Sequence, residues 1–328
     1  MLFIYVDWRL LNLAAMPEDA DDPFESEAHF IRFLTQRCMS LNMAMDLSDD
    51  CAWLKYKTDL LSTDTIIEGV HFEQKWATPE QIGRQAAVVS LSDLAASGSA
   101  PRWAMLSLEL PKSWLGNDLR ALCEGFLGEL NKHDAALIGG NCARTGGPLS
   151  ITVTVGGSLY GAHPITRSNA NPGDILCVSG VLGAAALAIH RPSAEHSLIR
   201  HNWRPHFDEA QMLVTSNIPT AMMDISDGLV VDAARIAHAS EVNIYIDTLA
   251  LPVLRDAAGY PQSDAMELAL YGGEDYVLLF TCSPTQRMPS WAFPIGTITE
   301  GVGTVFVDHQ PQVPKGFDHF RVDGGLSQ

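Results

Sequence analysis

Acidic and hydroxyl residues recur in five short stretches of this 328-residue chain, each beside an apolar run that predicts a strand or a helix. The five stretches are SDDCAWL with Asp49 and Asp50, LSTDTII with Ser62, Thr63 and Asp64, SLSDLAASG with Ser92 and Asp93, MDISDGL with Asp224, Ser226 and Asp227, and YGGEDYVLL with Glu274 and Asp275. Taken singly, SDDCAWL and LSTDTII are each typical of a turn whose side chains bond to nearby backbone. Local capping does not explain all of MDISDGL, because one helix N-cap accounts for Ser226 or Asp227 but not also for Asp224.

Asp93 differs from the other acidic residues because it is expected in the middle of a helix. Aspartate has poor helix propensity, and burying its carboxylate beside Leu91 and Leu94 is costly unless it has a partner. Carboxylates from several stretches would repel one another if they converged, and bound cations would relieve that repulsion. Oxygen ligands without a Cys/His cluster favour Mg²⁺ over zinc, and Mg²⁺ usually keeps phosphates and waters as its other ligands. The pattern therefore predicts phosphoryl transfer.

The composition limits the classes of partner. Lys and Arg total 21 against 39 Asp and Glu, and the formal charge of −18 disfavours nucleic acid and anionic membrane surfaces as partners. Six scattered cysteines without a C-x-x-C pair indicate neither a zinc site nor a dense disulfide framework. No apolar run approaches the roughly 18 residues of a membrane span. We therefore expect a cytoplasmic protein that binds neither nucleic acid nor membranes.

The length of the chain favours two domains. Residues 1–25 mix apolar and acidic residues without a sustained period, and we interpret them as an extension. The stretch GAHPITRSNANPGD at 161–174 is rich in Gly, Pro, Asn and Ser, which is typical of a domain junction. We expect an α+β domain with a mixed sheet at 26–160 and an α/β domain at 161–328.

Local patterns in the first domain predict its main elements. The segment LSTDTII is expected to be a strand that ends at its acidic residues. The pattern T-P-E-Q from Thr78 supplies the N-cap, proline and glutamine of a helix expected to end near Ser97. Helical spacing of apolar residues predicts a second helix over 117–133. ALIGG is expected to be a short buried strand, and alternation over 149–155 predicts a half-exposed strand.

The second domain reads as alternating strands and helices. DILCVSG, NIYIDTL and YVLLFTC predict strands, VLGAAALAI predicts a packed helix, and ISDGLVVDAARIAHAS predicts a helix whose start carries Ser226 and Asp227. The glycine pairs at 139–140 and 272–273 suit a close approach of backbone to phosphate, although such a pair is more often only a turn. The sequence has no Walker loop and no protein-kinase motif set, so a different nucleotide-binding fold is required.

Eight motifs occur in an order and spacing that resemble one enzyme family. They are SDDCA, STDTIIEGVHF, SLSDLAASGSAP, LIGGN, PITRSNANPGD, MDISDGL, YGGEDY and KGFDHF, and they extend over about residues 26 to 320. As a set they resemble thiamine-monophosphate kinase, within the aminoimidazole ribonucleotide synthetase superfamily. The resemblance implies an N-terminal domain that dimerises through its sheet. It also implies that ATP and several Mg²⁺ ions lie between the two domains and that thiamine phosphate is the acceptor.

The resemblance also implies roles for individual residues. The implied metal ligands are Asp50, Ser62, Thr63, Asp64, Asp93, Asn141, Asp224 and Asp227. The implied ATP contacts are Gly140, Asn141, Arg167 and Ser226, and the implied contacts to thiamine phosphate are His71, Glu274 and Phe317. Asp93 and Arg167 are the residues expected to act most directly on catalysis.

Several positions depart from the family pattern. Ser48 replaces a glycine, and Asn141 replaces an aspartate, which keeps an oxygen ligand but removes one negative charge. Gln85 stands where a lysine is frequent, with Arg84 beside it. Ala184 and Ala185 replace a polar pair, and Asp208 stands near the position of an expected arginine.

These departures favour one alternative, a divergent nucleotide-binding paralogue that is non-catalytic or has another substrate. Two other enzymes of the superfamily are less well supported. A hydrogenase-maturation protein is expected to end in a cysteine, whereas this sequence ends Leu326-Ser327-Gln328. A selenophosphate synthetase is expected to carry a reactive cysteine or selenocysteine with a lysine near its N-terminus, and none is so placed.

Overall fold

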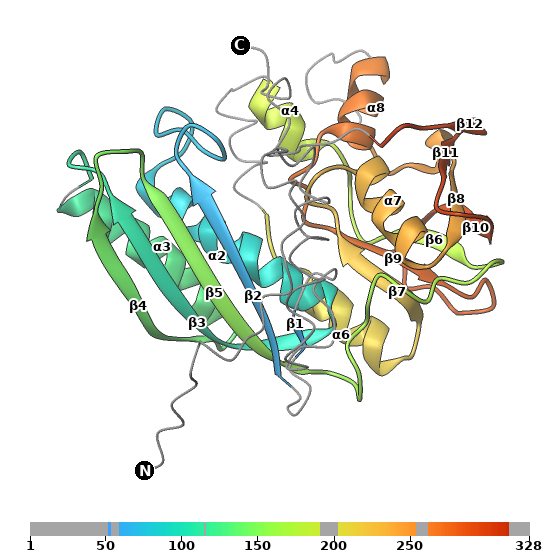
Figure 1. The fold of residues 1–328 in the computed structure, drawn as a ribbon, viewed down its shortest axis with the longest axis horizontal. Helices are drawn as coiled ribbons and strands as arrows, with labels where there is room; N and C mark the ends of the chain where they lie inside the picture. The colour runs from blue at the N-terminus through green and yellow to red at the C-terminus, as the bar shows by residue number, and fades with distance from the viewer. Residues whose placement is uncertain (1–51, 54–58, 115, 191–202, 254–261, 315–328) are drawn as a thin grey trace, which may run out of the picture.

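The structure is a computed structural model that describes residues 52–53, 59–114, 116–190, 203–253 and 262–314. Ser48, Asp50 and Phe317 lie outside the described residues. The described chain forms a mixed α/β fold with two sheets side by side, each covered by helices (Figure 1). Among the helices of these ranges, none combines the length and the apolar character needed to cross a bilayer.

The N-terminal half contains a five-stranded sheet with two helices on one face (Figure 1). The strands are β1 (Ala52–Trp53), β2 (Asp59–Ile67), β3 (Ser99–Leu110), β4 (Ala136–Arg144) and β5 (Ser150–Leu159), in the order β1-β2-β5-β3-β4. Only the β3–β4 pair is parallel within the described residues, so the sheet is mixed. The helices are α2 (Pro79–Ala96) and α3 (Asn117–Lys132).

The C-terminal half contains a seven-stranded sheet in the order β12-β11-β8-β10-β6-β9-β7. Its strands are β6 (Ile175–Val178), β7 (Pro219–Asp224), β8 (Val242–Ile246), β9 (Leu278–Cys282), β10 (Phe293–Glu300), β11 (Val305–Val307) and β12 (Gln310–Pro311). The helices are α4 (Ala184–His190), α6 (Phe207–Thr215), α7 (Leu229–Ala239) and α8 (Gln262–Tyr271), with a short 3₁₀ turn at Thr248–Ala250. Among the described strand pairs of this second sheet, only the β8–β11 pair is parallel.

The predicted start of the first helix, the extent of the second helix and the alternation of β5 are confirmed. The side chain of Thr78 accepts a hydrogen bond from the Gln81 amide, and the Gln81 side chain accepts one from the Thr78 amide, so the two residues form a capping box. Helix α3 occupies 117–132, as its periodicity predicts. The expected alternation of β5 is also observed, with Ile151, Val153 and Val155 buried.

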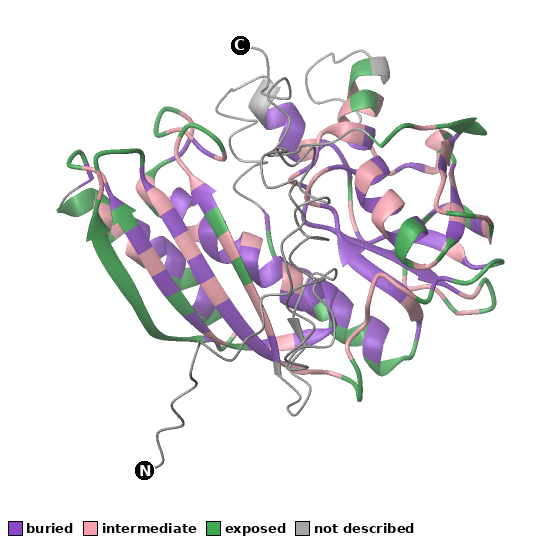
Figure 2. Cartoon of the chain, viewed as in Figure 1, coloured by how far each residue is buried: buried purple, intermediate pink, exposed green. Residues whose placement is uncertain are grey.

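Three expectations about local structure were wrong. Ser62 to Asp64 lie in the middle of β2 rather than at its end, because antiparallel pairing with β5 continues to Ile67. β4 is nine residues long and exposed along its whole length, not short and buried, because it is the edge strand of its sheet (Figure 2). The helix after MDISDGL begins at Leu229 with Gly228 as its N-cap, so neither Ser226 nor Asp227 caps it.

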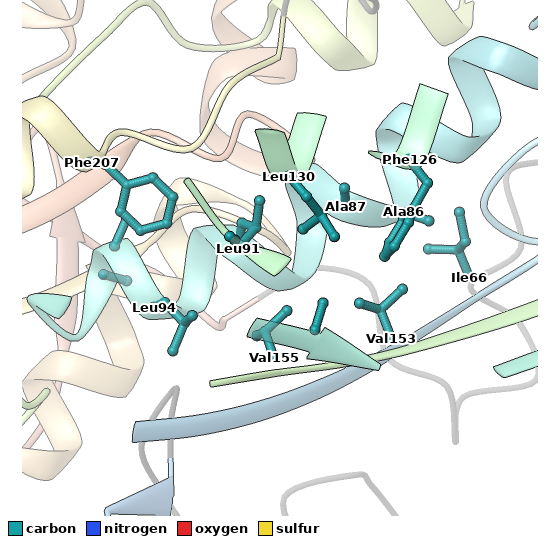
Figure 3. Close-up of a cluster of buried hydrophobic side chains, with 14 of the residues drawn as sticks. Ile66, Ala86, Ala87, Leu91, Leu94, Phe126, Leu130, Val153, Val155 and Phe207 are labelled. Atoms are coloured by element: carbon teal, nitrogen blue, oxygen red, sulfur yellow. The ribbon is translucent and has the colours of Figure 1, made fainter. Parts of the chain in front are cut away.

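One hydrophobic core runs from the first half into the second. Figure 3 shows side chains of β5, α2, α3 and α6 in a single cluster, with Val155, Leu91, Leu130 and Phe207 among them. The same cluster includes Phe280 of β9 in the second sheet. Because burying an apolar side chain stabilises by about 1.5–3 kcal/mol, this shared core opposes separation of the two halves.

A buried carboxylate adds a polar connection between the halves. Glu129 of α3 accepts hydrogen bonds from Nε of Arg84 at 2.9 Å and from Nζ of Lys132 at 2.8 Å. Burial alone would raise the pKa of Glu129, but bonds from His133 and Lys132 and the nearby positive charges outweigh burial and lower the pKa to about 2. Arg84 also donates to the carbonyl of Trp203 in the second half.

Helices α2 and α3 approach each other closely at two glycines. A Cβ atom at Gly83 would lie 1.9 Å from the carbonyl oxygen of Leu122, and one at Gly125 would lie 1.9 Å from the carbonyl oxygen of Glu80. Neither carbonyl belongs to a flexible side chain, so the helices must separate to admit a methyl group. At Gly128 of α3, by contrast, a Cβ meets nothing within 4 Å.

We expect Gly83→Ala and Gly125→Ala each to lower the free energy of unfolding by about 3 kcal/mol or more, because they overpack this crossing. Gly128→Ala is the matched control, and it should raise the free energy of unfolding by roughly 0.5–1 kcal/mol through helix propensity. Urea denaturation followed by circular dichroism measures all three. Equal stability of the Gly83 and Gly128 variants would contradict the close crossing.

Glu129→Gln should lower stability near pH 7 by about 3 kcal/mol, because it removes a buried carboxylate that the cationic side chains of Arg84 and Lys132 hold. The native pKa lies below its ordinary value near 4.5, so this contribution is present above pH 4.5 and is lost as the pH falls towards 2. Urea midpoints of wild type and variant should therefore converge across that window. Glu124→Gln, on the exposed side of α3, should change stability by less than about 0.5 kcal/mol at either pH.

Candidate functional site

Helix α2 presents two neighbouring polar side chains in different directions. Ser62 of β2 donates a hydrogen bond to Oδ2 of Asp93. The hydroxyl of Ser92 donates to Oδ2 of Asp224, at the end of β7, over 2.5 Å. The partner that Asp93 was expected to need is thus a hydroxyl of the adjacent strand, and the residue before it bonds to the second half of the chain.

The buried ring of Tyr276 marks the point where carboxylates from both halves gather. Burial raises the pKa of its hydroxyl well above the ordinary value, and the charges of Glu274, Asp224, Asp64 and Asp227 raise that pKa further. These four residues come from β2, the end of β7 and the two loops that follow β7 and α8. Within the described residues, these segments that are distant in the sequence therefore lie in one region of the fold.

The MDISDGL and YGGEDY segments are held together through their backbones. The amide of Glu274 donates to the carbonyl of Ser226 at 2.7 Å, and the amide of Tyr276 donates to the carbonyl of Ile225 at 2.9 Å. Gly273 has a φ of +67°, and a Cβ at this position would lie 2.6 Å from the Ser226 carbonyl oxygen. The second glycine of YGGEDY is therefore required by loop pairing.

Asp232 and Arg235 of α7 organise the turn that carries Asp227. Asp232 is fully buried, and its Oδ2 accepts hydrogen bonds from the amides of Ser226, Asp227 and Gly228 at 3.0, 3.1 and 3.2 Å. Arg235 pairs with Asp232 at 2.5 Å and with Asp227 at 2.6 Å. Burial raises the pKa of Asp232 to about 7, although the Arg235 charge opposes the shift.

Sequence reasoning missed both of these residues. Their separation of three positions on a helix was a signal that they could pair. The contact from Arg235 back to Asp227 across the turn was not visible in that spacing. It also shows that Asp227 has a basic partner, which offsets part of the negative charge of its stretch.

Arg167 belongs to the same electrostatic neighbourhood. Its positive charge lowers the pKa values of both Asp232 and Arg235, so its side chain lies within reach of the α7 start. The hydroxyl of Ser240, at the other end of α7, donates to the Arg167 carbonyl at 2.9 Å. It also accepts bonds from the amides of Asn169 and Ala170, which fixes this loop against α7.

His71 is held by its backbone neighbours just beyond β2. The Ile67 amide donates to Nδ1 of His71 at 3.0 Å, so a neutral His71 ring carries its proton on Nε2. The side chain of Gln85 donates to the His71 carbonyl over 3.4 Å. Position 85, where a lysine was expected, therefore supports the loop that carries His71.

The single chain does not bring every proposed ligand together. The side chain of Thr63 lies on the sheet face opposite Ser62 and Asp64, where it bonds to Thr154. Gly140 and Asn141 lie on β4, separated from β2 by β5 and β3. Asp275, beside the proposed Glu274, accepts a bond from the Gly183 amide at 2.8 Å and so stabilises the start of α4.

The oxygen-rich character of this cluster fits a hard cation. Within the described part of the chain, no three His, Cys, Asp or Glu side chains form a ready-made metal cage. Mg²⁺ does not require one, because it usually binds through one or two carboxylates and takes phosphate and water as its other ligands. Asp64, Asp93, Asp224 and Asp227, with the hydroxyl of Ser62, are the oxygen-bearing side chains here that could hold such an ion.

Comparison with known proteins places this arrangement in a family. The model for "AIR synthase related protein, N-terminal domain" matches residues 48–159. The thiamine-monophosphate kinase of Escherichia coli strain K12 is 34% identical over 313 residues, which are 87% of this chain and 94% of the relative. Two solved structures, AaThiL complexed with AMPPCP and TMP and thiamine monophosphate kinase from Aquifex aeolicus, superpose with TM-scores of 0.79 and 0.77 at 32% and 31% identity. They cover 90% and 88% of this chain, and it covers 97% and 98% of theirs. The chain belongs to the thiamine-monophosphate kinase family.

Proposed function

We propose that this protein transfers the terminal phosphoryl group of ATP to thiamine phosphate, giving ADP and thiamine diphosphate. The observation that carries the proposal is that hydrogen bonds join four acidic stretches of the chain. Ser62 bonds to Asp93, Ser92 bonds to Asp224, and the Glu274 amide bonds to the Ser226 carbonyl. The relative that is complexed with AMPPCP and TMP supports a nucleotide and thiamine phosphate as the two ligands. In the reaction, a phosphate oxygen of thiamine phosphate forms a bond to the γ-phosphorus as the bond to ADP breaks.

The acceptor needs little activation by a base. The second ionisation of a phosphate monoester lies near pH 6, so at neutral pH the attacking oxygen is mostly charged already. The task of the protein is then to bring two anions together and to stabilise charge on the transferred group. Arg167 is the proposed cation for this purpose, since its charge acts on the residues beside Asp227.

When bound, Mg²⁺ would neutralise phosphate charge between donor and acceptor. The proposed ligands are Asp50, Ser62, Thr63, Asp64, Asp93, Asn141, Asp224 and Asp227. Ser226, Gly140 and Asn141 are the proposed nucleotide contacts besides Arg167, and Glu274 and Phe317 are proposed to contact thiamine phosphate. His71 joins them through Nε2, which is suited to donate to a phosphate oxygen because Nδ1 accepts from the Ile67 amide.

A homodimer would complete this ligand set. Asn141 pairs with Ser107, Ser107 with Thr152 and Thr152 with Thr65, so Asn141 and Thr65 lie in one row at opposite sides of the sheet. Three strand spacings of about 4.8 Å put them roughly 14 Å apart in one chain. A second copy that docks β4 beside β2 would bring the partner's Asn141 to the edge of β2, on the sheet face that carries Thr63 and Thr65.

Both sheet edges needed for such docking are open in the described residues. β4 is exposed along its length and includes Leu137 and Ile138, which are 40% and 60% exposed. β1 pairs only with Leu60 and Leu61 of β2, and no described strand pairs with that edge from Ser62 onward. Long open edges with apolar side chains are typical of strands that pair with another chain. We therefore propose a twofold dimer formed through this sheet.

The alternative is a paralogue without kinase activity, favoured by Asn141 in place of the usual aspartate. Incubation of purified protein with ATP, Mg²⁺ and thiamine phosphate distinguishes the two, because the kinase forms ADP and thiamine diphosphate in equal amounts. Chromatography of both products is the measurement. Formation of neither product above a protein-free blank would remove the kinase proposal, and ADP alone would indicate another acceptor.

If each active site contains residues from both copies of the dimer, two inactive variants should complement each other. Asp93→Asn and Asn141→Ala should each lose most turnover. A mixed dimer, isolated through two different affinity tags, contains one intact site and should recover about half of the wild-type rate. The matched control is a mixed dimer of Asp93→Asn and Asp64→Asn. Because one copy contributes both Asp93 and Asp64 to a site, each site of this dimer carries one of the two changes, and it should recover no activity. A mixed Asp93/Asn141 dimer as inactive as its parents would contradict the shared site.

A further inference from the structure

The hydroxyl of Ser92 contacts a proposed metal ligand from the opposite half of the chain. Ser92 is 1% exposed and Asp224 is 2% exposed, and their hydrogen bond measures 2.5 Å. A serine inside a helix commonly bonds to the carbonyl four residues earlier or points to solvent. Ser92 does neither in this bond, since its hydroxyl donates to a carboxylate of β7. Such short hydroxyl–carboxylate bonds are about twice as strong as neutral ones.

The backbone around Asp224 is fixed independently of Ser92. Asp224 pairs with Leu278 in the β7–β9 ladder, and the next residue, Ile225, donates its amide to the Val277 carbonyl at 2.9 Å. What the ladder leaves undetermined is the rotation of the Asp224 carboxylate. The Ser92 hydroxyl donates to Oδ2 of that carboxylate. Because the carboxylate is planar, this bond also restricts the direction in which Oδ1 points.

We propose that Ser92 is a positioning residue that orients the Asp224 carboxylate for binding of the Mg²⁺–nucleotide complex. This inference rests on the proposed function, because it assumes that Asp224 faces the metal. Groups that hold metal ligands in this way typically change metal affinity by about 10–100-fold when they are removed. Ser92 lies on the same helix that places Asp93 against Ser62. This one helix therefore fixes the positions of a carboxylate in each half of the chain.

The test measures binding rather than turnover. The melting temperature of the full-length protein is recorded as Mg²⁺ is titrated at saturating AMPPCP, and the midpoint of the Mg²⁺-dependent rise is compared between variants. Ser92→Thr and Ser92→Val have nearly the same shape and differ in the hydroxyl. We expect Thr to keep the wild-type midpoint and Val to raise it about tenfold. Ser92→Ala should also raise it.

Ser90→Ala is the matched control for loss of a buried hydroxyl from the same helix. Ser90 is fully buried, and its Oγ has no hydrogen-bond partner among the described residues. Its removal should leave the Mg²⁺ midpoint unchanged. The inference is overturned if Ser92→Ala and Ser90→Ala share one midpoint, or if the Thr and Val variants respond alike. A wild-type protein without any Mg²⁺-dependent rise would overturn the proposed function and this inference together.

Discussion

Repulsion between carboxylates in a shared, partly buried site is the constraint around which this structure is organised. The charges of Asp64, Asp224, Asp227 and Glu274 all raise the pKa of the Tyr276 hydroxyl, and hydrogen bonds join the segments that carry them. In a low-dielectric setting, like charges at such range destabilise the fold unless donors or cations offset them. The chain meets this requirement with hydroxyl donors for Asp93 and Asp224 and with a guanidinium for Asp227.

The constraint explains why the two halves are joined so firmly. Donors from one half serve acceptors in the other, as Ser92 does for Asp224 and Arg84 for the Trp203 carbonyl. The rings of Trp203 and Tyr276 pack in a T-shaped arrangement, with centroids 5.4 Å apart. The continuous apolar core and the close glycine crossing of α2 and α3 keep these donors in place. Carboxylates could not be balanced across halves that moved independently.

The features of the fold that could be predicted from the sequence are those that depend on interactions between neighbouring residues. The capping box at Thr78 and the alternation of β5 depend on neighbouring residues, so both were predictable. The apolar segment of β4 was expected to be buried, but whether a strand is central or at an edge depends on the order of distant strands. Ser62 to Asp64 were placed at a strand end for the same reason, since only pairing with β5 extends β2 to Ile67.

The candidate site shows the same division. Asp93 was recognised because a helical aspartate among leucines needs a partner, but Ser62 could not be identified as that partner. Arg235 was missed because its contact with Asp227 crosses a turn that the sequence does not specify. The family resemblance supplied Asn141, and only the sheet order shows how far it lies from Asp64 in one chain.

The two kinds of donor leave the carboxylates in different states. A serine hydroxyl donates one hydrogen bond and leaves the net charge of its acceptor in place, whereas a guanidinium cancels charge as well. Asp93 and Asp224 are held by Ser62 and Ser92 in the first way, so both can still attract a divalent ion. Asp227 and Asp232 share Arg235, and Asp232 also binds three backbone amides. Hydroxyls thus orient the carboxylates whose charge a cation can use, while Arg235 and Asp232 fix the loop that brings Asp227 beside them.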